Sequence, residues 1–152
     1  MLKPPYFELA GEMLMKIAVL IARVMLGLLF LVSGLNGILH FMKPPPMPPS
    51  DAMTFANILM SSNYMTFVAL LMLIAGLLLL VGRFVPLALT ILGPILVNIL
   101  LFHFFLMHSG AAMGIVATLL ELFLIYAYRR SFMGLFDAAP EIAPPSVPAA
   151  KP

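Results

Sequence analysis

The sequence lacks cysteine, and charged residues make up only 9% of its 152 residues. Without cysteine the chain cannot form disulfides, exchange thiols, hold an iron–sulfur cluster through cysteine or attach haem covalently. Any redox role must therefore rely on a non-covalently bound cofactor or on a partner subunit. The net charge of +2 is small, and nothing in the sequence indicates nucleic-acid binding.

Hydrophobic residues, by contrast, make up 63% of the chain and gather into long runs. Runs of about 20 apolar residues match the roughly 30 Å hydrocarbon core of a bilayer, and helices satisfy their own backbone hydrogen bonds there. The sequence thus predicts an all-α polytopic membrane protein, a four-transmembrane-helix bundle. Its membrane domain covers residues 17–136, with spans at about 17–39, 64–81, 84–107 and 111–128.

Three segments outside the spans have distinct compositions. Residues 1–16 are polar enough to form a short interfacial lead, and residues 137–152 form a Pro/Ala-rich tail that we expect to be disordered. The proline-rich loop at Lys43–Pro49 cannot be helical. Ser50 after it is a predicted N-cap, so a short interfacial helix should follow.

Small residues and basic residues indicate how the spans pack and how they are oriented. Gly27, Gly34 and Gly37 in the first span indicate close approach of a neighbouring helix. With four spans, one side of the membrane holds six of the seven basic residues in loops and termini, and the other holds only Lys43. The positive-inside rule then places both termini in the cytoplasm. The six are Lys3, Lys16, Arg83, Arg129, Arg130 and Lys151.

Arg23 and Glu121 are the charges set inside apolar runs, and Glu121 follows 37 uncharged residues. A charge in hydrocarbon costs at least a few kcal/mol and usually has a partner. Both lie roughly 9–10 Å from the same end of their spans, at 1.5 Å of rise per residue. The sequence predicts a buried ion pair between them that fixes how the first and fourth spans dock. The alternative hypothesis is that Glu121 takes up a proton or binds a ligand.

A second polar layer is predicted near the opposite membrane surface. Asn36, His40, Asn98 and His103 reach similar depth, roughly 27–28 Å from the inner side for Asn36 and His103. A mostly apolar setting with a few convergent polar groups is typical of a small-molecule pocket, so these four are candidate ligand-binding residues. A quinone would suit it, and two histidines are in principle able to ligate haem. The alternative is that the groups bond to each other across helices. No spacing indicates a metal site.

Several segments together resemble the DoxX-like family of small four-helix bacterial membrane proteins. They are Arg23–Gly34, Lys43–Pro49, Gly82–Leu87, Val97–His103 and Tyr126–Arg129. The resemblance implies a multi-pass protein of the bacterial inner (cytoplasmic) membrane. Some relatives are small subunits of a thiosulfate:quinone oxidoreductase, and others are linked to oxidative-stress complexes with soluble partners. The family has no agreed catalytic motif, so no catalytic residue is carried over.

Three functions are compatible with the sequence. The first is a quinone-linked subunit of a redox or oxidative-stress complex, without catalysis of its own, in contact with membrane lipid and with redox partner subunits or further copies of itself. The second is a non-catalytic membrane scaffold or anchor for partner proteins. The third is a small proton-coupled transporter built around Glu121. Fold alone does not choose among them.

Overall fold

A computed structural model describes residues 5–43 and 48–136, and every regular element in these ranges is a helix. The tail at 137–152 and most of the proline-rich loop lie outside the described residues. The elements in chain order are α1 (Pro5–Leu39), α2 (Asp51–Ser61), α3 (Tyr64–Val81), α4 (Val85–Leu101), the π-helix η1 (Phe102–Met107), α5 (Ala112–Ala127), α6 (Arg129–Phe132) and the 3-10 helix η2 (Met133–Phe136).

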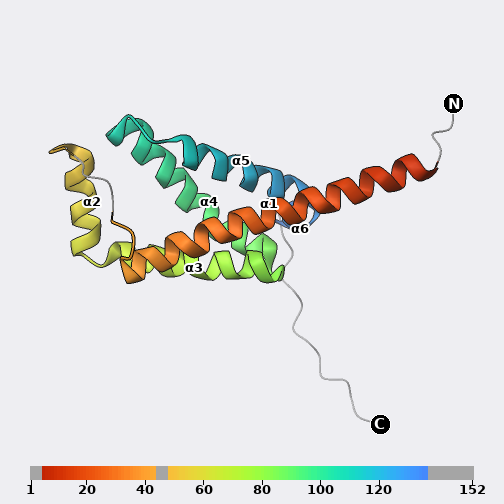
Figure 1. Cartoon of the computed structure of the whole chain (residues 1–152), viewed down its shortest axis with the longest axis horizontal. Helices are drawn as coiled ribbons and strands as arrows, with labels where there is room; N and C mark the ends of the chain where they lie inside the picture. The colour runs from red at the N-terminus through yellow and green to blue at the C-terminus, as the bar shows by residue number, and fades with distance from the viewer. Residues whose placement is uncertain (1–4, 44–47, 137–152) are drawn as a thin grey trace, which may run out of the picture.

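Four long helices form a closed ring. α1 packs on α3, α3 on α4, α4 on α5, and α5 returns to α1. Successive helices run in opposite directions, so the start of α1 and the α5–α6 junction lie at one end of the bundle, while α2 and η1 lie at the other (Figure 1). Apolar side chains from all four helices fill the centre, among them Leu26, Phe30, Leu79, Leu92 and Leu124. The predicted all-α bundle is confirmed.

The lengths of these helices suit a bilayer. Three segments of the described chain are long and apolar enough to cross one, namely Leu9–Leu39, Tyr64–Val81 and Val85–Met107. A fourth crossing is available if Ala112–Ala127 and Arg129–Leu135, which are bent by 82° at their junction, are counted as one span. Outward-facing Leu, Ile and Phe side chains around the ring are the expected covering where lipid is the solvent.

α1 and α3 approach until their backbones touch. A Cβ on Gly34 would lie 2.7 Å from the carbonyl oxygen of Ala69, and one on Gly37 would lie 2.6 Å from the Cβ of Ala69. A Cβ on Gly27 would lie 3.2 Å from the carbonyl oxygen of Gly76. No residue larger than glycine fits at such distances without movement of the neighbour. The prediction that these glycines mark a helix contact is confirmed, and α3 is the partner.

The first third of α1 differs from the expectation. Residues 5–16, expected as a separate interfacial lead, are the first three turns of the same continuous helix. This part of α1 extends past the ends of the other helices (Figure 1). Every residue from 9 to 18 is exposed. Hence only the later part of α1 is packed in the bundle, and the side chains of residues 9–18 remain exposed within the described chain.

The short helix predicted after the proline-rich loop is α2. The Ser50 side chain accepts a hydrogen bond from the backbone N–H of Met53 at 3.3 Å, so the predicted N-cap is confirmed. α2 packs against α3 and against η1. Its Phe55 ring stacks on Phe102, with 6.1 Å between ring centroids. α2 therefore covers the end of the bundle at which η1 lies.

Candidate functional site

Arg23 and Glu121 do not form the predicted ion pair. The only salt bridge in the described part of the chain joins Lys16 to Glu12 at 3.8 Å. Arg23 Nε and Glu121 Oε1 are both buried and have no hydrogen-bond partner among the described residues. The predicted contact between them is therefore wrong.

Arg23 extends toward the turn between α3 and α4. A Cβ on Gly82 would lie 2.5 Å from Arg23 Nη1, so the guanidinium rests on this turn. Gly82 is also the C-cap of α3, with φ +77°. The C-terminal end of a helix carries partial negative charge and attracts a cation. The Arg23 guanidinium therefore lies at the partially negative end of α3.

Glu121 faces the core on the α4 side. It is 4% exposed, and its Oε1 is 3.7 Å from where a Cβ on Gly93 would lie. Its neighbours on the same face of α5, Ala117 and Leu124, are also buried. Helical rise sets how deep a residue lies, whereas rotation about the helix axis sets what it faces. Glu121 faces the middle of α4, whereas Arg23 faces the turn at the end of α3.

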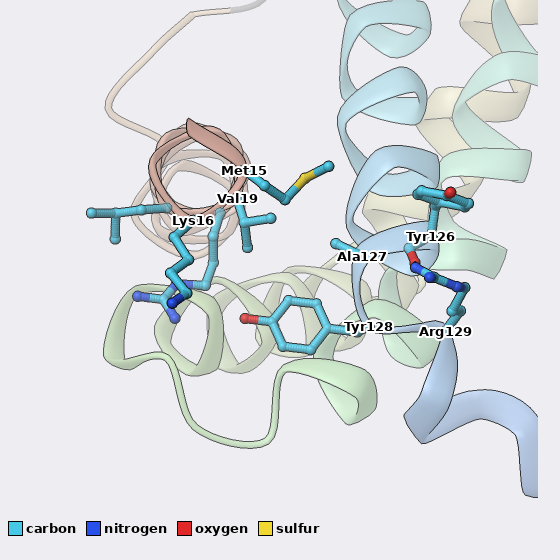
Figure 2. A pocket seen from close by; sticks show the side chains of 9 residues that line it. Met15, Lys16, Val19, Tyr126, Ala127, Tyr128 and Arg129 are labelled. Atoms are coloured by element: carbon cyan, nitrogen blue, oxygen red, sulfur yellow. The ribbon is translucent and has the colours of Figure 1, made fainter. Parts of the chain in front are cut away.

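A hollow opens between α1 and the end of α5, close to Arg23. Its volume is about 640 Å³. Figure 2 shows Met15, Lys16 and Val19 reaching into it from α1, opposite Tyr126, Tyr128 and Arg129. Residues from the ends of two spans meet here, and three of the lining residues are basic. We call this hollow the basic groove. It was not predicted from the sequence, although Lys16, Arg23 and Arg129 were each recognised near the ends of spans.

The outer polar residues bond locally instead of converging. Asn36 Oδ1 accepts a hydrogen bond from the backbone N–H of Met42 at 2.7 Å, just after α1 ends. His40 is exposed and takes φ +53° at the end of α1. Asn98 Nδ2 donates to the carbonyl oxygen of Pro94 at 3.0 Å, within its own helix. These are contacts within one helix or at the end of one, so the binding of a ligand by all four residues together remains a prediction.

His103 has a different setting, in the π-helix. Its Nδ1 is 2.8 Å from the carbonyl oxygen of Ser109, which closes the turn after η1. A hollow of about 300 Å³ lies beside it, lined by His103, Phe104, His108, Ser109, Gly110 and Ala111. Of the four predicted ligand residues, only His103 lines this hollow. Single π-helical turns are rare and often occur at functional sites.

These features define a class: a small polytopic helical membrane protein with basic residues concentrated at one end of its bundle. A family model described as DoxX matches residues 18–109, which is more than half of the chain. The chain belongs to the DoxX family, as its sequence motifs indicated. No curated protein and no solved structure matches the chain.

Proposed function

We propose that the protein is a membrane subunit, without catalysis of its own, that recruits a partner protein through residues 5–16 of α1. The observation that carries the proposal is the free beginning of α1. This helix has 35 residues, about 52 Å at the usual rise, whereas the hydrocarbon core is about 30 Å thick. About 20 Å of an upright α1 would project beyond the core.

The projecting segment has the surface of a docking helix. Leu9, Met13 and Leu14 are 66%, 65% and 68% exposed. On an adjacent face, Glu12 and Lys16 form the salt bridge and stay in solvent. Apolar side chains in lipid need no further partner, but apolar side chains beyond the membrane indicate an interaction site. Leu9 and Met13 have the i, i+4 spacing by which a helix anchors in a groove of another protein.

A photo-crosslinking side chain at position 13 tests this proposal in intact cells. We expect Met13 to give a discrete adduct with a single partner protein, and the double variant Leu9→Glu/Leu14→Glu to lose it. The matched control is position 119, because Leu119 is 61% exposed but lies within the span α5. An adduct of twice the 16.6 kDa chain mass would indicate self-association, and identical adducts from both positions would indicate lipid-facing contacts; either result contradicts the proposal.

A quinone-linked role is the second candidate, and the setting of His103 favours it. A carbonyl oxygen only accepts hydrogen bonds, so the contact with Ser109 requires a proton on His103 Nδ1. In the neutral ring Nε2 is then an acceptor. An acceptor at Nε2 suits a quinol, whose hydroxyl would donate to it while Phe104 packs against the quinol ring. A quinone carbonyl, which needs a donor, would not bind to neutral His103 in this way.

Quinone content of the purified protein tests the second candidate. We expect wild-type protein to retain quinone or quinol from the membrane and His103→Asn to lose it. His40→Asn is the matched control, because His40 does not line the hollow and asparagine tolerates its positive φ. Background quinone in the wild type, or equal loss in both variants, would leave partner recruitment as the only role supported.

A further inference from the structure

The basic groove combines positive charge with an apolar wall. Its cations are Lys16 and Arg23 on α1 and Arg129 after α5, and its apolar side chains on α1 include Val19 and Leu20. No carboxylate is among the residues that line it. The nearby Glu12 forms a salt bridge with Lys16, and both side chains are more than 70% exposed. Salt bridges at such exposed positions contribute little stability.

Beside the groove lies a donor without a partner among the described residues. Arg23 Nε is buried and has no hydrogen-bond partner in the described chain. A buried donor without an acceptor is costly, so a ligand that supplies an acceptor is favoured. Phosphate oxygens match the fork of guanidinium donors and accept two parallel hydrogen bonds from it, as carboxylate oxygens do.

The other groups of the groove are already positioned. Arg129 Nη1 donates to the carbonyl oxygen of Tyr126 at 3.0 Å, and its guanidinium stacks over the Tyr126 ring at 4.6 Å. From the same side, Tyr128 points its hydroxyl toward Lys16 across the groove (Figure 2). Lys16 and the Tyr128 hydroxyl thus approach the groove from opposite walls, and Arg129 is held against Tyr126 on the α5 side.

We propose that the basic groove binds one anionic phospholipid. Its phosphate would lie among Lys16, Arg23 and Arg129, and an acyl chain would follow Val19 and Leu20 along α1 into the hydrocarbon. A volume of about 640 Å³ accommodates far more than a single phosphate ion, and the apolar wall would remain uncovered by a free ion. Basic pockets between membrane helices are known to bind anionic head groups.

Native mass spectrometry of the delipidated full chain in neutral detergent tests the proposal. The probes are phosphatidylglycerol, phosphatidylcholine and inorganic phosphate. We expect phosphatidylglycerol to bind in a ratio of one to one and the other two to bind far more weakly. The double variant Lys16→Gln/Arg129→Gln should bind phosphatidylglycerol roughly 30-fold more weakly, given the usual attraction per basic residue at an anionic membrane surface.

The matched control is Arg83→Gln/Arg130→Gln. It removes the same charge from the same end of the bundle, but neither residue lines the groove. Both side chains are exposed, as are those of Lys16 and Arg129, so both double variants should fold. Equal weakening in the two variants would show attraction by overall charge, equal binding of phosphatidylcholine would show an unspecific lipid contact, and equal binding of inorganic phosphate would show an anion site. Each of these results overturns the proposal.

Discussion

Helix α1 presents two contrasting sides to its neighbours. Toward α3 it is lined by Gly27 and Gly34, and the two backbones come into contact. Toward α5 it presents Lys16, Val19 and Arg23, and a groove remains open. The same helix is thus in close contact with α3 along its later part and accessible toward the end of α5 along an earlier part.

The size of the residues at the interface decides how closely the helices approach in this bundle. In lipid, helices associate through van der Waals packing, which needs small residues at the interface. Where α1 carries glycine it reaches the backbone of α3, and where it carries long basic side chains it leaves a hollow. The sealed side holds the fold together, whereas the open side is available to a ligand.

The largest effect is expected at the sealed interface. In the double variant Gly34→Ala/Gly76→Ala, the new methyl groups would collide with the backbone of the facing helix. Overpacking of this kind costs about 1–3 kcal/mol per site, so the thermal midpoint in detergent should fall markedly. The matched control is Gly11→Ala/Gly134→Ala, because neither position has an atom within 4 Å of the added Cβ. A similar midpoint for both double variants would contradict backbone contact between α1 and α3.

A smaller effect is expected at the turn on which Arg23 rests. Gly82→Ala should cost about 1–2 kcal/mol for the left-handed backbone, and more because the methyl group displaces the Arg23 guanidinium. In an Arg23→Gln background the second part of the cost should disappear. Chemical or thermal unfolding of the two single variants and the double variant measures this. If Gly82→Ala costs the same in both backgrounds, Arg23 does not lie against the turn.

The smallest effect is expected between Arg23 and Glu121. Because the two side chains face different neighbours, Arg23→Gln and Glu121→Gln should change the free energy of unfolding additively, within about 0.5 kcal/mol. Glu121→Gln alone should not destabilise the protein, since it replaces a buried carboxyl that lacks a partner at Oε1 with a neutral group of equal size. If the double variant instead recovers 1 kcal/mol or more of the lost stability, Arg23 and Glu121 do interact, which would contradict this account.

Much of the fold was predictable because it depends on local signals. Apolar runs marked the spans, Ser50 marked the start of α2, and the glycines of the first span marked a close contact. The continuity of α1 was missed, because Glu12 and Lys16 were interpreted as the end of a polar segment when they form a pair on one helical face.

The candidate sites were less predictable because they depend on rotation about helix axes. Depth along a span follows from counting residues, but the direction in which Arg23 or Glu121 points depends on packing around the whole ring. The same limit applies to the basic groove, which exists only because α5 ends beside an uncovered face of α1. The proton on His103 Nδ1 depends on a turn that brings Ser109 back to the ring.

α1 is buried where it faces the bundle core and accessible where it lines the groove, and thiol labelling measures this difference. The chain has no cysteine, so a single introduced thiol gives no background. Val19 lines the groove, whereas Ala22, one turn further along α1, is 4% exposed in the core. In phosphatidylcholine nanodiscs, Val19→Cys should react with a small maleimide much faster than Ala22→Cys, and added phosphatidylglycerol should slow only the first reaction. Equal rates at the two positions, with no effect of the anionic lipid on either, would contradict the account.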